Sequence, residues 1–154
     1  MTLDEGIHIH DKNSFIRTNA FLYVFKNIQT AKIAVISGPP GCGKTSVAHL
    51  TAVTFREIYN YTVIFVSNPT QIINLIDSST KQIFVIDDIV GKHYLDDDSL
   101  HTWRKYANQI KEILSQSEKT KLIVTCRSYI YRNNKFSLIR LPHIHCDMLA
   151  DEMA

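Results

Sequence analysis

The chain has 154 residues, a length typical of one domain, and 45% of them are hydrophobic and 21% charged. This composition is that of a globular protein and excludes a disordered or fibrous chain. Lys and Arg number 17 and Asp and Glu number 15, and the net charge of +2 does not by itself predict a nucleic-acid or membrane surface.

The N-terminal residues lack the features of a secretory signal, because acidic Asp4 and Glu5 are not followed by an apolar segment. The apolar runs of the chain are far shorter than the about 20 residues that a bilayer requires. Three cysteines, Cys42, Cys126 and Cys146, form no C-x-x-C pair, which favours reduced thiols. We therefore expect a soluble, cytoplasmic protein without a membrane segment.

Hydrophobic residues alternate along the chain between two spacings. Short runs rich in Ile and Val predict strands buried on both faces at 32–37, 61–66, 82–86 and 121–125. Between the runs, apolar residues three and four apart predict amphipathic helices. Strands that alternate with helices predict a single α/β domain, with a parallel sheet covered by helices on both faces.

Three predicted helices each have one apolar face. The first contains Phe21, Val24, Phe25 and Ile28, the second Val47, Leu50, Val53 and either Phe55 or Ile58, and the third Leu100, Trp103, Ala107, Ile110 and Leu114. Either Asp98 or Ser99 is expected to cap the third helix at its N-terminus.

The segment between the first strand and the second helix matches the phosphate-loop pattern G-x-x-x-x-G-K-[ST]. The residues expected to bind a nucleotide there are Gly38, Pro39, Pro40, Gly41, Cys42, Gly43, Lys44, Thr45 and Ser46. Glycines allow backbone N–H groups to surround a phosphate, and the helix N-terminus adds positive potential. Lys44 is expected to reach the β- and γ-phosphates, and the Thr45 hydroxyl to bind Mg²⁺.

Cys42 is one of the variable positions of this loop. The positive potential of the surrounding amides is expected to lower the pKa of its thiol, which would suit a redox sensor. A small residue that only fills a variable position is the favoured interpretation.

The third strand, Gln82–Ile86, is followed by two carboxylates. In phosphate-loop folds an acid at this position holds the Mg²⁺ shell, so Asp87 is the predicted metal-side residue. Asp88 is the candidate for polarising the attacking water. The alternative for both is an ordinary transition from strand to loop, where Asp is common.

The fourth strand ends in Thr125, Cys126 and Arg127. Polar residues at this end of a parallel sheet face the ligand, so Arg127 is a candidate clamp for the γ-phosphate. The chain lacks an N/T-K-x-D guanine motif after a later strand, which disfavours GTP. His143 and His145 share a strand face that excludes Cys146, so a zinc site there is also disfavoured.

Taken in order, these elements resemble the STAND class of P-loop ATPases, and most closely the novel STAND NTPase 3 domain. The matching segments are 15–18, 38–45, 83–92, 103–105, 123–127 and 130–131. The resemblance covers residues 14–150 and implies a sheet in the order 5-1-4-3-2. It also implies that Phe15, Ile16 and Arg17, placed before the first helix, line the base pocket.

The resemblance implies an ATP-driven signalling switch, often found in innate-immune receptors, that binds ATP or ADP with Mg²⁺ and self-associates within a longer protein. Residues 1–13 are expected to form a tail and 151–154 a C-terminal end that stops before any lid or winged-helix module. ATP hydrolysis is expected to be slow, with Lys44, Asp88 and Arg127 as catalytic residues. Two alternatives remain: a small-molecule kinase using Arg127, Arg132 and Arg140, or a scaffold that binds nucleotide without hydrolysis.

Overall fold

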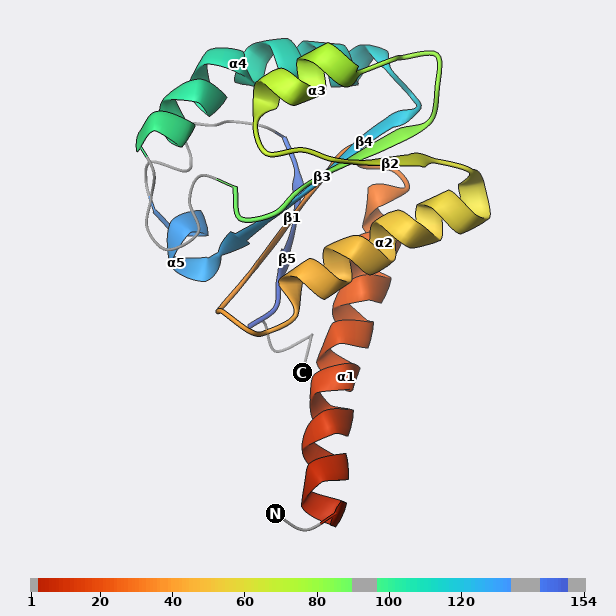
Figure 1. Cartoon of the computed structure of the whole chain (residues 1–154), viewed down its shortest axis with the longest axis vertical. Helices are drawn as coiled ribbons and strands as arrows, with labels where there is room; N and C mark the ends of the chain where they lie inside the picture. The colour runs from red at the N-terminus through yellow and green to blue at the C-terminus, as the bar shows by residue number, and fades with distance from the viewer. Residues whose placement is uncertain (1–2, 90–96, 134–141, 150–154) are drawn as a thin grey trace.

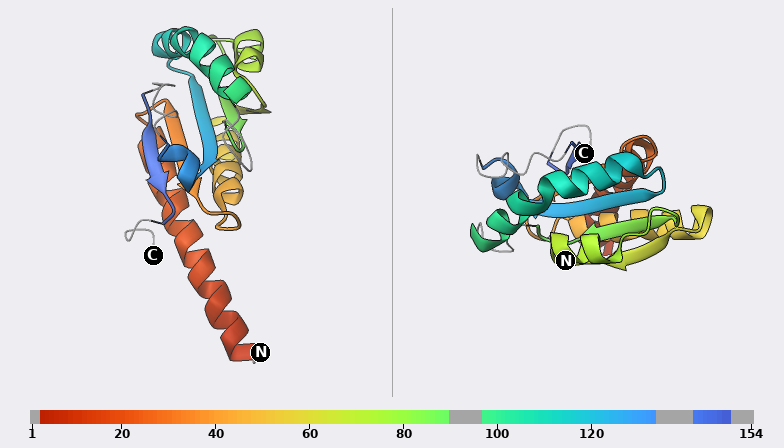
Figure 2. Two further views of the ribbon diagram at one scale, coloured as in Figure 1. Left: turned by 90° about the vertical axis from the view of Figure 1, so that its left-hand side faces the viewer. Right: turned by 90° about the horizontal axis from the view of Figure 1, so that it is seen from above.

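The computed structural model of the chain contains a five-stranded sheet with helices on both faces (Figure 1, Figure 2). It describes residues 3–89, 97–133 and 142–149, with only the backbone for residues 3–15. The strands are β1 (Ile33–Gly38), β2 (Thr62–Phe65), β3 (Gln82–Ile86), β4 (Thr120–Arg127) and β5 (Ile144–Asp147). The helices are α1 (Leu3–Ile28), α2 (Lys44–Tyr59), α3 (Pro69–Leu75), α4 (Asp97–Gln116) and the short α5 (Ser128–Tyr131).

The strands lie in the order β2-β3-β4-β1-β5, and every neighbouring pair is parallel. Counted from the other edge, this is the predicted order 5-1-4-3-2, which is confirmed. The carboxyl ends of all the strands meet at one edge of the sheet, where open α/β folds bind their ligands. Because β3, β4 and β1 are consecutive neighbours, the segments that follow them are brought together at that edge.

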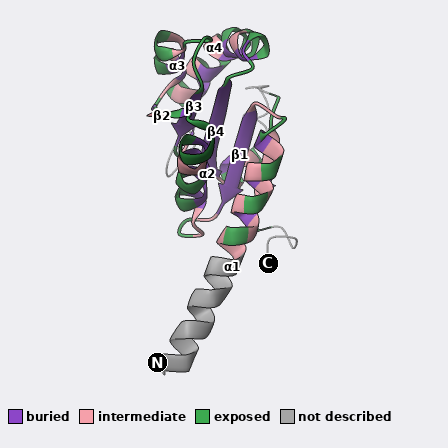
Figure 3. Cartoon of the chain, turned by 90° about the vertical axis from the view of Figure 1, so that its right-hand side faces the viewer, coloured by how far each residue is buried: buried purple, intermediate pink, exposed green. Residues whose placement is uncertain are grey.

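Alternate residues of the central strands face opposite layers of helices. In β1, Ile33 and Val35 pack in a core cluster with α3 and α4, whereas Ala34 and Ile36 pack in a second cluster with α1 and α2. Every residue of β1 and β3 is buried, as the purple strands in Figure 3 show. Burial on both faces explains why these strands are continuous apolar runs in the sequence.

The apolar face that the sequence predicts for the third helix is confirmed in full in α4. Its buried residues are Leu100, Trp103, Ala107, Ile110 and Leu114. The predicted cap was wrong, because the helix begins at Asp97 and both Asp98 and Ser99 lie inside it. Asp97 and Asp98 are in the first turn, where the helix dipole favours negative charge.

Two predicted burial patterns were wrong in part, although Val47 and Phe55 of α2 are buried as predicted. Leu50 and Ile58 on α2 are 50% and 59% exposed. The buried residues of that helix are Lys44, Val47, Ala48, Thr51, Ala52 and Phe55, a face of mainly small side chains that lets the helix approach its neighbours closely. The β2 strand is not buried on both faces, because it is an edge strand with Thr62 and Phe65 exposed.

Helix α1 begins at Leu3 and therefore includes most of the segment 1–13 that the sequence assigns to a tail. Its buried line consists of Ala20, Val24 and Ile28, and Ile16 is partly buried one turn earlier. This spacing of four residues extends the apolar stripe upstream of the predicted helix start. No helix in the described part of the chain is long and apolar enough to cross a membrane.

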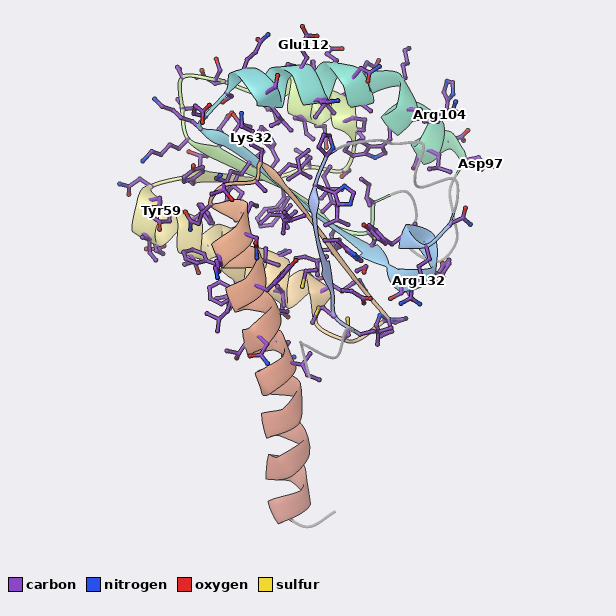
Figure 4. The ribbon with its side chains drawn as sticks, turned by 180° about the vertical axis from the view of Figure 1, so that it is seen from behind. Lys32, Tyr59, Asp97, Arg104, Glu112 and Arg132 are labelled. Atoms are coloured by element: carbon purple, nitrogen blue, oxygen red, sulfur yellow. The ribbon has the colours of Figure 1, made fainter. Side chains whose placement is uncertain are left out.

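Two lysines at the amino ends of the strands hold the C-termini of helices. The Lys121 Nζ donates hydrogen bonds to the carbonyls of Ile28 at 2.6 Å and of Ala31 at 3.3 Å, which fixes the end of α1. Burial, together with nearby Lys32, lowers the pKa of Lys121. The Nζ of Lys32, which Figure 4 labels, donates to the Leu114 carbonyl near the end of α4. In both contacts a lysine ammonium group lies near the negative, C-terminal end of a helix dipole, which is a favourable position for a cation.

Candidate functional site

The loop between β1 and α2 is built for close approach of its backbone to a ligand. Gly41 and Gly43 have φ angles of 76° and 97°, a region that glycine adopts without strain. A Cβ added to Gly38 would lie 2.5 Å from the Sγ of Cys42, so the turn has no room for a side chain there. A Cβ on Gly43 would lie 2.6 Å from the Cδ of Arg17. The loop therefore requires glycine for conformation at two positions and for space at two.

The N-terminus of α2 opens directly onto this loop. Its N-cap residue is Gly43, which provides no side-chain hydrogen bond to the first N–H groups of the helix. These uncapped amides carry the positive end of the dipole of a 16-residue helix. Lys44 is 7% exposed and its Nζ donates to the Pro39 carbonyl at 3.3 Å. The loop thus presents backbone amides and one ammonium group, a combination that binds anions.

A carboxylate from β3 meets a hydroxyl from α2. The Thr45 hydroxyl donates to Oδ1 of Asp87 at 2.9 Å and lies 3.1 Å from Oδ2. The same Oδ1 of Asp87 also accepts a hydrogen bond at 2.5 Å from the hydroxyl of Thr125 in β4. Thr45 and Asp87 are both exposed, so they form an accessible pair of hard oxygen ligands next to the loop. Such ligands suit Mg²⁺, and the two predicted metal-side residues are therefore brought together.

Asp88 has an unusual backbone conformation, with φ at 54°, which residues other than glycine rarely adopt. Its amide donates to the Thr125 hydroxyl at 2.9 Å, and the next amide, of Ile89, donates to the Thr125 carbonyl at 2.8 Å. Left-handed residues that neighbouring groups hold in place are concentrated at functional sites. The half-buried Asp88 thus lies beside Asp87 in a conformation that the neighbouring strand maintains.

Arg127 ends β4 and pairs in register with Gly38, the first residue of the loop. Its Nε and the hydroxyl oxygen of Ser128 are buried without a hydrogen-bond partner among the described residues. Such buried polar atoms are uncommon, and a site for a bound anion is one physical explanation for them. The predicted anion-clamping arginine therefore lies at the same edge of the sheet as the loop.

The resemblance to the STAND class placed Arg17 before the first helix. In the structure Arg17 lies within α1. Its side chain lies against Gly43, and it lines a cavity of about 480 Å³ between α1 and the first turns of α2. The cavity is lined by Arg17, Thr18, Phe21, Ser46, Val47 and Leu50. Of the other two predicted base-pocket residues, Ile16 is partly buried against the core cluster of α1 and α2, and the side chain of Phe15 falls outside the described part of the structure.

The thiol of Cys42 behaves differently from the prediction. Burial raises its pKa, and this effect outweighs the lowering by Lys44 and the nearby backbone amides. Its Sγ lies 3.9 Å from the Sδ of Met148. Burial likewise raises the pKa of Cys126 to about 12. Both thiols are therefore protonated near neutral pH, which favours the interpretation of Cys42 as a small packing residue.

Sequence reasoning missed the role of Thr125, which was expected to face the γ-phosphate but is fully buried against the two acids. The only available signal was a polar residue inside the apolar run Leu122–Cys126. It also missed the hydrogen bond of 2.6 Å between the Ser37 hydroxyl and the His145 ring.

Within the described residues, no group of three or more His, Cys, Asp or Glu side chains is arranged to hold a metal ion.

Comparisons with known proteins agree with this architecture. Among solved structures, the DnaC helicase loader has a TM-score of 0.52 and 17% sequence identity, over 84% of this chain and 90% of that chain. PCH-2 of C. elegans has a TM-score of 0.47 and 15% identity, over 89% of this chain and 41% of that chain. At 17% identity, the similarity to the DnaC helicase loader concerns the fold alone. No curated protein sequence matches the chain significantly.

The family comparison extends over nearly the whole chain. The model of the novel STAND NTPase 3 family matches residues 15–152, which include all five strands of the sheet, the glycine-rich loop, both acids and Arg127. The chain therefore belongs to the novel STAND NTPase 3 family, and the domain described above is a nucleotide-binding NTPase core.

Proposed function

We propose that this domain is the Mg·ATP-binding core of a STAND-type signalling switch and that it hydrolyses ATP slowly. One observation carries the proposal: the uncapped N-terminus of α2 and its glycine loop lie beside the Thr45–Asp87 pair, at one edge of the sheet. Amides and a lysine suit a polyphosphate, while a hydroxyl and a carboxylate suit the divalent cation that accompanies it. The resemblance to phosphate-loop NTPases supports the same assignment.

The phosphate chain would be held by the amides of residues 41–46 and by the ammonium group of Lys44. Lys44 is already buried in the loop, so a phosphate oxygen would take the place of the Pro39 carbonyl that its Nζ contacts. Thr45 and Asp87 would hold Mg²⁺, which when bound neutralises charge on the phosphates. The Thr45 hydroxyl proton is directed at Asp87, which leaves the lone pairs of its oxygen available for the cation.

The cavity of about 480 Å³ beside Ser46 and Arg17 would receive the nucleoside, since it adjoins the C-terminal end of the loop. Its volume is within the range of small-molecule sites, and Phe21 and Leu50 provide apolar contacts for a base. We infer adenine because the chain contains no N/T-K-x-D guanine motif after a later strand. Either ATP or ADP would fit this arrangement.

Hydrolysis requires groups at the γ-phosphate end of the site. Asp88 would orient or deprotonate the attacking water, and Arg127 would stabilise charge on the phosphate through its guanidinium. An arginine that binds phosphate would satisfy the buried Nε that the described residues leave without a partner. We further infer self-association within a longer signalling protein, of the innate-immune receptor kind, and this inference is supported only by the family.

Nucleotide titration by calorimetry tests the proposal. ATP with Mg²⁺ is expected to bind the wild-type domain, and Lys44→Ala is expected to weaken binding by about tenfold to a hundredfold, because a charge-assisted contact to phosphate is lost. Lys111→Ala removes an exposed lysine of α4 and is the matched control. Equal affinity of wild type and Lys44→Ala would refute the phosphate-loop assignment.

Single-turnover product analysis separates the proposed reaction from the other possibilities. Free phosphate is the expected product. Phosphate found on an added acceptor would indicate a kinase, and bound ATP without turnover would indicate a scaffold.

A further inference from the structure

Thr125 is a fully buried hydroxyl residue in an otherwise apolar part of β4. Its hydroxyl contacts the two acids that follow β3. It lies 2.5 Å from Oδ1 of Asp87, the predicted metal-side residue, and 2.9 Å from the backbone nitrogen of Asp88, the predicted catalytic residue. Its carbonyl accepts the amide of Ile89 at 2.8 Å. One residue of β4 therefore contacts three consecutive residues that follow β3.

The direction of these hydrogen bonds is determined by the chemistry of the groups. The Asp88 amide has a proton and can only donate, so the Thr125 oxygen must be the acceptor there. The ionised carboxylate of Asp87 can only accept, so the Thr125 hydroxyl proton must point at it. The hydroxyl rotor consequently has a single orientation. A serine can reproduce both bonds, whereas a valine of nearly the same shape can make neither.

The two bonds have different consequences for the two acids. Asp87 is held between the hydroxyls of Thr125 and Thr45, which directs its carboxylate toward the loop before any ligand binds. Asp88 is held through its backbone, since successive amides donate to the hydroxyl and the carbonyl of Thr125. These bonds maintain the φ of 54° at Asp88, which sets the direction in which its side chain leaves the backbone.

We propose that Thr125 is a positioning residue that orients Asp87 through its side chain and Asp88 through its backbone, without itself contacting the nucleotide. This inference rests on the proposed function, because it assigns Asp87 and Asp88 to the metal and to the attacking water. It also differs from a purely structural role, since it requires Thr125 to act through the two acids.

The ligand-free protein provides the first test, by amide hydrogen exchange measured with NMR. Thr125→Val removes the acceptor of the Asp88 amide but keeps the carbonyl that accepts from Ile89. We expect the Asp88 amide to exchange about tenfold faster or more, while the Ile89 amide changes much less. Thr51→Val is the matched control, because Thr51 is equally buried and its hydroxyl donates only within α2, to Val47. Unchanged exchange of Asp88 in Thr125→Val would overturn the proposal.

The second test compares ATP affinity with and without Mg²⁺. In Thr125→Val, the ATP affinity without Mg²⁺ is expected to stay within about twofold of the wild-type value. The increase in affinity on adding Mg²⁺ is expected to be about tenfold smaller than in the wild type, whereas Thr125→Ser is expected to keep the full increase. In an Asp87→Asn background, Thr125→Val is expected to cause no further loss. If the valine variant does not fold, Thr125→Cys substitutes a weak hydrogen-bonding group of similar size and is expected to lose part of the gain.

The outcomes distinguish this inference from the proposed function. A wild-type domain that shows no Mg²⁺-dependent gain would contradict the proposed function, while the exchange experiment still tests the positioning by Thr125. If Mg²⁺ increases the ATP affinity of the wild type and Thr125→Val or Thr125→Cys keeps that increase in full, the positioning role alone is overturned. An additional loss in the Asp87→Asn background would show that Thr125 acts through general stability and would also overturn it.

Discussion

The hydroxyl oxygen of Thr45 lies 2.9 Å from Oδ1 of Asp87, although the two residues are 42 positions apart in the sequence. One residue belongs to the first turn of α2 and the other follows the end of β3. The parallel sheet alone brings them together, because it gathers the carboxyl ends of its strands at one edge. A hydroxyl beside a carboxylate is a partial coordination shell for Mg²⁺, which phosphate and water would complete.

Asp87→Asn tests whether this pair carries the metal dependence of nucleotide binding. The substitution removes the charge but nearly preserves the size, so the metal-free ATP affinity is expected to change by less than about twofold. The gain on adding Mg²⁺ is expected to fall by about tenfold or more, because a neutral amide is a poor ligand for this cation. Calorimetry in EDTA and in Mg²⁺ measures both values. Glu57→Gln, an exposed carboxylate paired with neighbouring Arg56, should resemble wild type, and a full gain in Asp87→Asn would refute the assignment.

Asp88→Asn separates the carboxylate from the backbone at the second acid. Asn tolerates left-handed conformations, so the variant is expected to fold and to bind ATP like the wild type. Its rate of ATP hydrolysis is expected to fall by about 10² or more, because the amide cannot act as a base. Asp88→Gly accepts the φ of 54° without strain and also lacks the carboxylate, so it should be equally inactive. Hydrolysis at the wild-type rate in both variants would exclude Asp88 from the reaction.

Gly43→Ala and Gly41→Ala differ in a way that the structure predicts. Both positions have positive φ, which costs about 1–2 kcal/mol for alanine. A Cβ at Gly41 would meet nothing within 4 Å, whereas one at Gly43 would lie 2.6 Å from the Arg17 side chain. Urea denaturation is therefore expected to show a larger loss of stability for Gly43→Ala. The added variant Arg17→Ala should remove only the steric part of that loss, and equal losses in the two single variants would contradict the contact.

His145 is expected to make the stability of the domain depend on pH. Burial lowers the pKa of His145 below its ordinary value of 6.5, and the ring is held against Ser37 and stacked on Tyr131 at 3.7 Å. As the pH falls below about 6.5, the unfolded chain takes up a proton that the folded chain resists. The free energy of unfolding should therefore fall until the folded histidine also protonates.

His145→Gln supplies the control for this effect. The difference in unfolding free energy between wild type and variant, measured in urea at about pH 7.5 and about pH 5.5, should shrink at the lower pH. A difference that stays constant would mean that His145 does not titrate differently in the two states.

Much of the fold could be predicted from the sequence because it depends on periodicity and on one specific loop. The spacing of Trp103, Ala107 and Ile110 identifies the buried face of α4, since an amphipathic helix that packs on a sheet has one apolar side. The loop from Gly38 to Thr45 identifies the edge of the sheet where the site lies. The sheet order came from the resemblance to a family, and not from the pattern of any strand.

The remaining features depend on packing that a linear pattern does not contain. Helix α2 packs against both α1 and the sheet, and it buries small residues such as Ala48 and Ala52 while Leu50 stays exposed. An apolar run does not reveal that β2 is an edge strand. The sign of the pKa change at Cys42 depends on burial, which outweighs the amides and Lys44. The role of Thr125 requires contacts across 37 and 38 positions of sequence.

The most direct test of the account is a crystal structure of the domain with Mg²⁺ and a non-hydrolysable ATP analogue. The account predicts phosphates within hydrogen-bond distance of the amides of residues 41–46 and of the Lys44 Nζ, with the cation bound to Thr45 and Asp87. A nucleotide bound elsewhere, with this loop closed to any anion, would contradict it.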